Sequence, residues 1–218
     1  MFKQLLSVFL ETHCIFCQRS TPSNILCQYC WQKLSSYQLS NSDRLKLYQT
    51  QATFSWGKYD GLLKRAIALM KYHNKPEIGN ELGTLLGRAW LNSKFIRFPS
   101  KVTAVPIPLH QSKQQQRGFN QAQIIAKSFC DTTGYKLNTQ ALVRIKETEA
   151  MFNLNSAERI RNLQGALQVG KKLPQYQVLL IDDIYTTGTT VAEAVKVFQQ
   201  KSIPVIGVAT VATAGRFR

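Results

Sequence analysis

Acidic residues are scarce in this chain of 218 residues, which has 12 Asp and Glu against 28 Lys and Arg and a formal net charge of +16 at pH 7. The excess is not confined to a tail, because residues 1–100 hold 13 basic and 5 acidic side chains and residues 101–218 hold 15 and 7. A field of this sign attracts polyanions, such as nucleic acid, highly phosphorylated small molecules or anionic lipid. A merely basic surface is the alternative.

Long apolar runs are also missing. None approaches the roughly 20 residues that span a bilayer, so we expect no membrane insertion. The apolar stretch at residues 5–10 is followed by Glu11, and no small-residue cleavage site marks a secretory signal. We therefore expect a cytoplasmic protein. A hydrophobic fraction of 44% excludes general disorder, and the length suits one main domain with a small appendage.

Cysteine is sparse, and four of the five cysteines form one C-x2-C-x9-C-x2-C motif made of Cys14, Cys17, Cys27 and Cys30. Disulfides seldom persist in a reducing cytosol, whereas two C-x2-C turns supply the four thiolates of a closed, tetrahedral, structural zinc site. Redox couples, a degenerate site, or His13 in place of one cysteine are the alternatives. We expect residues 1–50 to form the zinc knuckle and a linker, and residues 51–218 to form the main domain.

The first half of the main domain has helical periodicity. Apolar residues from Leu62 to Met70 recur at helical spacing, and Lys64, Arg65 and Lys71 predict a basic outer face for this helix. A second helix is expected from about Pro76, which suits a first turn, to Trp90.

From residue 101 onward, short apolar runs alternate with helical patterns, which predicts an α/β fold with a parallel sheet flanked by helices. The expected helices cover residues 121–129 and 191–200, and the apolar runs cover residues 102–107, 137–143, 163–169, 178–181 and 205–211. In open sheets of this type the ligand crevice lies beyond the carboxyl ends of the strands.

The segment VLLIDDIYTTGTT, residues 178–190, has the strongest functional signal. A buried strand followed by a Thr/Gly turn and a helix N-terminus makes an anion cradle, in which Gly188 permits close approach and backbone amides point inward. The four hydroxyls that add donors belong to Thr186, Thr187, Thr189 and Thr190. Ordinary helix capping by Asp and Thr is the alternative.

The adjacent carboxylates of Asp182 and Asp183 constrain the ligand. They would repel a phosphorylated ligand unless they face its neutral hydroxyls or a bound Mg²⁺, so the ligand should have a phosphate end and a diol end, as a ribose 5-phosphate has. Successive strand residues point to opposite faces. If the strand continues through Asp183, only one of the two acids faces the ligand directly.

Two further segments carry basic residues suited to the same ligand. Arg117 precedes Gly118 and a helix expected from Asn120, which makes it a second candidate anion contact; a solvated loop arginine is the alternative. Residues 144–162, with four Arg or Lys side chains, predict a polar lid over the crevice.

The segment VLLIDDIYTTGTT resembles the signature of type I phosphoribosyltransferases, which bind 5-phosphoribosyl-1-pyrophosphate (PRPP). The rest of the chain is similar to the ComF family, whose members are associated with competence for DNA uptake. The resemblance rests on the cysteine knuckle, Lys71-Tyr72, VPIPLH at 105–110, RGFNQA at 117–122 and ERIRNLQGAL at 158–167. Met151 departs from the family pattern, which has Gln there.

The resemblance implies a function for each motif. Asp182 and Asp183 would hold the ribose hydroxyls with or without Mg²⁺, residues 186–190 the 5-phosphate, and the VPIP segment the pyrophosphate. The implied reaction displaces pyrophosphate from ribose C1 through an oxocarbenium-like state. The favoured hypothesis is a phosphoribosyltransferase acting on or beside single-stranded DNA, with competence DNA-uptake proteins as partners. A non-catalytic DNA-processing adaptor or PRPP-responsive regulator and a nucleobase-salvage enzyme are the alternatives.

Overall fold

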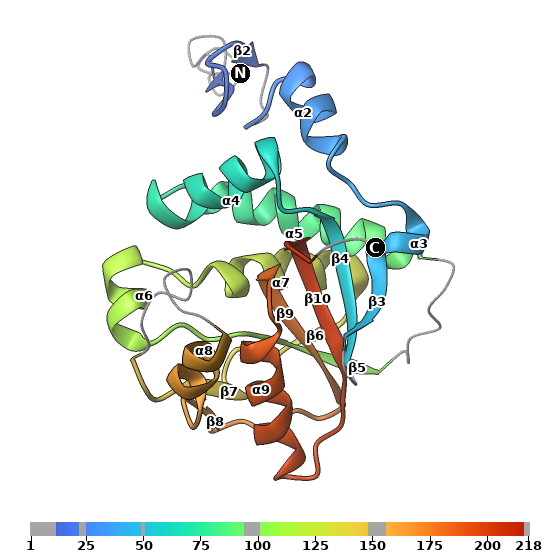
Figure 1. The fold of residues 1–218 in the computed structure, drawn as a ribbon. Helices are drawn as coiled ribbons and strands as arrows, with labels where there is room; N and C mark the ends of the chain where they lie inside the picture. The colour runs from blue at the N-terminus through green and yellow to red at the C-terminus, as the bar shows by residue number, and fades with distance from the viewer. Residues whose placement is uncertain (1–11, 22–24, 49–50, 94–100, 148–155, 216–218) are drawn as a thin grey trace, which may run out of the picture.

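A six-stranded sheet with helices on both faces forms the main body of the protein (Figure 1). The computed structural model describes residues 12–21, 25–48, 51–93, 101–147 and 156–215. The strands follow one another across the sheet in the order β3 (Leu45–Tyr48), β4 (Gln51–Lys58), β10 (Val205–Thr213), β9 (Gln177–Tyr185), β5 (Val102–Pro106) and β6 (Lys136–Leu137). The predicted α/β class is confirmed.

The pairing is parallel throughout the sheet except at one edge. β4, β10, β9, β5 and β6 pair in parallel, while β3 runs antiparallel to β4. The predicted parallel sheet is thus present, and the hairpin of β3 and β4 adds one antiparallel edge strand that was not predicted. Residues 45–48 lie in the stretch expected to be a linker, yet they join the main sheet.

Helices divide between the two faces of the sheet. The described helices are α2 (Gln28–Ser35), α3 (Asn41–Arg44), α4 (Gly61–Tyr72), α5 (Pro76–Leu91), α6 (Gln111–Arg117), α7 (Gln121–Thr133), α8 (Ser156–Leu163) and α9 (Thr189–Gln199). The apolar faces of α4, α5 and α7 share one buried core, and α9 forms a second core on the opposite face. Among the residues that the structure describes, no helix is both long enough and apolar enough to cross a bilayer.

Local sequence determines where α4 and α5 begin and how closely α5 packs on α7. Asp60 accepts a hydrogen bond from the Gly61 amide at the start of α4, and Pro76 occupies the first turn of α5. Gly79 and Gly83 on α5 face α7 so closely that a Cβ atom at either would meet Ile124 or the Ile125 backbone. This close contact fixes α7, whose N-terminus lies at the carboxyl end of β5.

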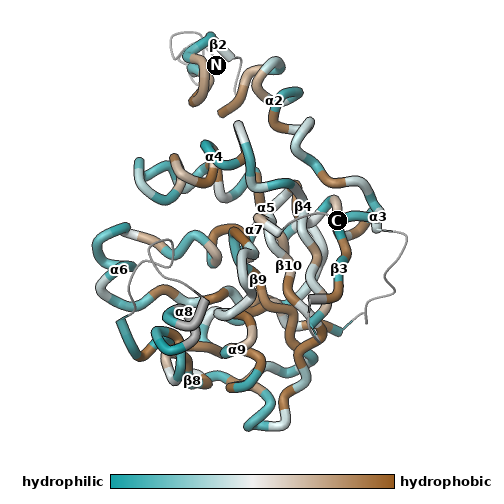
Figure 2. Tube along the Cα trace, in the orientation of Figure 1, coloured by the Kyte–Doolittle hydropathy of each residue, from teal (hydrophilic) through white to brown (hydrophobic). Residues whose placement is uncertain are grey.

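Several expected strands lie elsewhere. The runs at 137–143 and 163–169 do not form central strands, because β7 (Leu142–Arg144) and β8 (Leu167–Val169) pair with each other in a separate two-stranded sheet. The central strand β4 was not predicted. Helix α6 was also not predicted, and Figure 2 shows it as almost wholly hydrophilic, so it has no apolar periodicity to reveal it.

The cysteine knuckle is an irregular unit that packs on α4. It contains the two-residue strands β1 (Thr12–His13) and β2 (Ser20–Thr21), which pair antiparallel, and leads into α2. Phe16 and Leu26 join the core under α4, and the Arg65 guanidinium donates a hydrogen bond to the Phe16 carbonyl over 3.3 Å. The knuckle therefore covers the outer side of α4.

Candidate functional site

The two adjacent acids lie on β9 and point to opposite faces of the sheet. The strand continues to Tyr185, beyond the predicted apolar run. Leu179 and Ile181 belong to the core under α4, α5 and α7, whereas Val178 and Leu180 pack toward α9. By strand alternation Asp183 faces the side of α4, α5 and α7, and Asp182 faces the side of α9. A ligand held on one side of the sheet can therefore face only one of the two acids.

Asp183 is buried and forms an ion pair with Lys71, the penultimate residue of α4. Burial alone would lower the pKa of Lys71, but the Asp183 carboxylate outweighs burial and raises it. The side chains are 18% and 6% exposed. The pair is therefore shielded from solvent, and Lys71 is the cation that the structure places against this acid.

Lys71 corrects a prediction. We expected it on the basic outer face of its helix, but its side chain points inward to β9. The signal was present in the spacing, since position 71 follows Ile67 by four residues and so shares the apolar face of α4. A lysine at such a position requires a buried partner.

The structure strongly raises the pKa of Asp182. Burial, reinforced by the neighbouring Asp183 carboxylate, raises the pKa of Asp182 to about 8, against the opposing effects of Lys71 and Arg144. Its Oδ1 accepts a hydrogen bond from the Asp183 amide over 2.8 Å. Near neutral pH this carboxyl therefore carries a proton that a cationic or hydroxyl-rich ligand can displace.

This acidity predicts a pH-dependent stability. An unfolded aspartate has a pKa of about 3.9, so between about pH 4 and about pH 8 the unfolded chain loses a proton that folded Asp182 retains. The Asp182 carboxyl thus lowers the free energy of unfolding as pH rises, and this loss is complete above about pH 8. Asp182→Asn is expected to raise the free energy of unfolding, much more at about pH 8.5 than at about pH 5.

Urea unfolding of the variant at both pH values checks this expectation. Asp131→Asn, at an exposed position on α7, controls for the loss of one negative charge. A gain for Asp182→Asn that is the same at both pH values would contradict the raised pKa.

The turn after β9 is open to an anion. Thr186 and Thr187 are exposed, and Gly188 begins α9 with φ 75°, where a Cβ would collide with the Tyr185 hydroxyl. No side chain caps the first turn of α9, so the capping alternative is not supported. The first amides of a helix have no intrahelical acceptor, and the hydroxyls of Thr187 and Thr189 lie 2.9 Å apart. Donors thus gather at the positive end of the helix.

Arg117 lies at the end of α6 rather than in a loop. It donates a hydrogen bond to the Gln121 side chain, and its Cζ lies 5.7 Å from the centroid of the Tyr72 ring. The structure therefore places Arg117 beside the helix that carries Lys71 and does not bring it against Asp182.

Basic side chains from α6 and β7 form a cluster near the acids. Burial, followed by the Arg144 guanidinium, lowers the pKa of Lys113; the Glu147 carboxylate opposes this change, and Arg117 adds a further lowering. Burial also lowers the pKa of Arg144, and the Asp182 carboxylate opposes this lowering. Cations held close enough to oppose each other's charge favour binding of an anion. Sequence reasoning did not single out Lys113, because an isolated lysine in a glutamine-rich segment has no distinguishing pattern.

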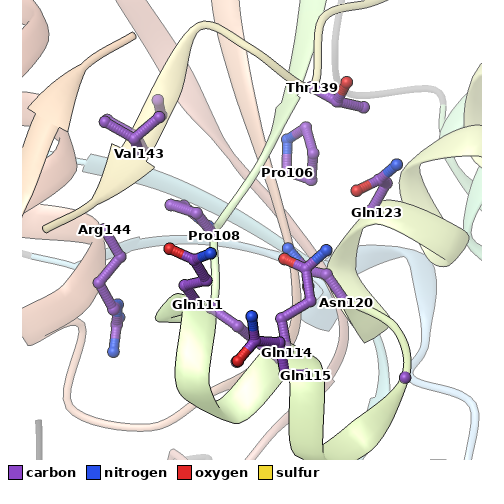
Figure 3. Close-up of a pocket in the computed structure, with 13 residues that line it drawn as sticks. Pro106, Pro108, Gln111, Gln114, Gln115, Asn120, Gln123, Thr139, Val143 and Arg144 are labelled. Carbon is purple, nitrogen blue, oxygen red and sulfur yellow. The ribbon is translucent and has the colours of Figure 1, made fainter. Parts of the chain in front are cut away.

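A cavity of about 590 Å³ opens beside this cluster (Figure 3). Pro106 and Pro108, at the end of β5, and Leu142 supply apolar walls, while Arg144 is its charged lining residue. The amides around it belong to Gln111, Gln114, Gln115, Asn120 and Gln123. The VPIP segment thus lies where it was expected, at the carboxyl end of a strand next to β9.

The expected lid falls only partly within the described residues. Residues 148–155, including Met151, lie outside them. Of the remainder, Arg144 ends β7, and residues 156–163 form α8, which lies beside α9. The amide of Gly165, just beyond this segment, donates a hydrogen bond to Glu193 over 2.8 Å, which ties the chain after α8 to α9.

The four cysteines of the knuckle meet at one point. Their sulfur atoms all lie within 4.8 Å of one another, and those of Cys17 and Cys27 lie 3.5 Å apart. A tetrahedral zinc–thiolate site with bonds of about 2.3 Å places its sulfurs about 3.8 Å apart, so the cluster fits a metal ion. Burial opposes ionisation of Cys14, but the backbone amides of Cys27, Cys17 and Phe16 outweigh it and lower the pKa of Cys14 to about 6. Cys130 lies apart, buried on α7.

Fold and site together define an α/β protein with a turn rich in amide and hydroxyl donors at the carboxyl edge of its sheet and an N-terminal four-cysteine cluster. No protein-family model matches the chain. The chain is 28% identical to Competence protein F of Haemophilus influenzae, over 89% of this chain and 87% of that protein. It is 26% identical to DNA utilization protein YhgH of Escherichia coli K12 (83% and 81%) and 25% identical to Competence protein ComFC of Bacillus subtilis (86% and 72%). These similarities support a ComF family protein, in agreement with the sequence motifs.

Proposed function

We propose that this protein is a PRPP-binding phosphoribosyltransferase that acts in the uptake or utilisation of single-stranded DNA. The observation that carries the proposal is the uncapped turn at residues 186–190, which follows closely on the two acids, together with the Lys113, Arg117 and Arg144 cluster, whose Arg144 interacts electrostatically with Asp182. A ligand with an anion at each end and a diol between them complements this arrangement. The DNA role is supported by the net charge of +16 and by the printed names of the relatives.

The proposed reaction needs positioning and charge rather than a nucleophilic side chain. The acceptor forms a bond to ribose C1 as the bond from C1 to pyrophosphate breaks; pyrophosphate leaves, and the acceptor gives up a proton. Residues 186–190 would hold the 5-phosphate, and the basic cluster would hold the leaving group. Of Asp182 and Asp183, the acid that faces the ligand would stabilise positive charge on the ribose ring directly, and the other would act through the turn or Mg²⁺. Mg²⁺, when bound with PRPP, would neutralise pyrophosphate charge.

Zinc is the metal that we propose for Cys14, Cys17, Cys27 and Cys30. Four sulfur donors suit zinc better than a hard cation, and a complete set of four leaves no open position for catalysis. The ion would serve the fold of the knuckle.

One observation favours a second candidate, a PRPP-responsive regulator without catalysis. Asp183 is paired with Lys71, and the pKa of Asp182 is about 8, so near neutral pH neither acid is a free anion in the described structure. A site of this kind can bind a diol without stabilising an oxocarbenium ion.

A pyrophosphate-release assay with PRPP and Mg²⁺ tests the proposal. Release is expected to increase on addition of single-stranded DNA, because the strand supplies the acceptor. Stimulation by free nucleobases alone would indicate a salvage enzyme. PRPP binding by calorimetry with no release under any condition would indicate the regulator.

A further inference from the structure

Tyr72 is an exposed aromatic residue at the C-terminal end of α4. Its side chain is 69% exposed, although it follows Lys71, which is paired with buried Asp183. Among the described aromatic residues, only Tyr29 is comparably exposed, at 54%. A single exposed ring needs no partner by itself, but one next to a candidate binding site offers a flat apolar surface that a ligand can cover.

Arg117 fixes the orientation of the ring. Its guanidinium lies over the Tyr72 ring at 5.7 Å and is itself held by a hydrogen bond to Gln121 on α7. The contact joins the C-terminal end of α4 to that of α6, on the same side as the Lys71–Asp183 pair. The ring is thus oriented on one side by a cation, and much of its remaining surface is open.

The chemistry of these groups selects the ligand. A flat, uncharged, π-rich surface suits the Tyr72 ring, and a phosphate suits the neighbouring arginine. A nucleobase offers the first property, and a nucleotide strand offers both. A protein segment would bring no matching negative charge unless it were acidic.

We infer that Tyr72, oriented by Arg117, is the platform on which a nucleobase of the acceptor stacks next to the ribose carboxylates. The inference rests on the proposed function for the place of the ribose, and it adds the substrate class and the residue that recognises it. The base can come from single-stranded DNA or from a free nucleobase, and both present the same face to the ring.

The test compares Tyr72→Ala with Tyr72→Phe, which keeps the ring, and with Tyr29→Ala, which removes a second exposed tyrosine with an arginine over it on the knuckle. The probes are a short fluorescent single strand of deoxyadenosine, an abasic strand of equal length and free adenine, each with PRPP and Mg²⁺ present. Stacking on an aromatic side chain predicts a loss of about 5- to 150-fold in affinity for the base-bearing strand in Tyr72→Ala.

The pattern across variants separates stacking from a general defect. Tyr72→Phe is expected to bind as the wild type does, affinity for the abasic strand should not change, and the salt dependence should stay the same because no phosphate contact is lost. A loss confined to free adenine would assign the platform to a free base, and a loss with the strand would assign it to DNA. Equal binding by Tyr72→Ala to every probe, or an equal loss on the abasic strand, would overturn the inference.

Calorimetry with PRPP alone distinguishes this inference from the proposed function. Tyr72→Ala should bind PRPP as the wild type does, because the ring lies outside the phosphate turn. Absence of PRPP binding in the wild type would refute the proposed function, whereas a Tyr72-dependent preference for base-bearing strands would still support the platform.

Discussion

Cys30→Ser is expected to eliminate bound zinc and to unfold the knuckle while the sheet stays folded. In zinc-finger peptides the ion contributes about 10–16 kcal/mol of apparent binding free energy, which is also folding free energy. The knuckle has little else to stabilise it, because β1 and β2 have two residues each and its apolar contacts consist mainly of Phe16, Leu26 and Leu34 in the core shared with α4. The main sheet has its own cores on both faces.

Two measurements check this expectation: the zinc content per chain, and limited proteolysis of the knuckle. Cys130→Ser is the matched control, since Cys130 is buried on α7 and belongs to no metal-binding cluster among the residues that the structure describes. It should cost packing free energy but retain zinc. Full zinc content in Cys30→Ser, or zinc-free wild-type protein from zinc-replete cells with an intact knuckle, would contradict the proposed site.

The sequence predicted helices and strands correctly where their apolar residues form a regular pattern that packs on the core. α4, α5 and α9 have apolar residues at helical spacing, and β5, β9 and β10 are mainly apolar and largely buried on both faces. β4 was missed because Ser55 and Thr53 interrupt its apolar pattern. The Ser55 hydroxyl is buried and lies 2.9 Å from that of Thr210 on the neighbouring strand, a tertiary contact that no local pattern shows.

The site was predictable to the extent that it lies within one segment. Residues 178–190 combine the acids, the turn and the helix start in continuous sequence, so local chemistry was sufficient to identify them. Lys71, Lys113 and Arg144 come from α4, α6 and β7, and only the fold brings them to the same sheet edge. In a chain with 28 basic residues, charge alone cannot distinguish these three.

Asp183 combines a structural and a proposed binding role, and the two can be separated by removing charges in pairs. Asp183→Asn leaves the largely buried Lys71 ammonium without its carboxylate, and breaking such a pair costs about 3–5 kcal/mol. Lys71→Met with Asp183→Asn removes both charges and keeps the approximate side-chain volumes. The free energy of unfolding of this double variant is therefore expected to return near the wild-type value, which urea unfolding measures.

Adding Asp182→Asn to that double variant is expected to abolish PRPP binding in a folded protein. The two ribose hydroxyls can both donate to the carboxylate that faces them, and each hydrogen bond contributes about 1.5–3 kcal/mol, so their loss predicts a reduction in affinity of more than about 100-fold by calorimetry. Because Asp182→Asn also relieves the cost of a carboxyl whose pKa is raised to about 8, the triple variant should be at least as stable as the double variant at about pH 8. Stability and ligand affinity should thus change in opposite directions at the same residue, as is common where a site is built at the expense of the fold. Retained PRPP affinity in the folded triple variant would refute the role of both acids, and a triple variant less stable than the double variant would contradict the raised pKa of Asp182.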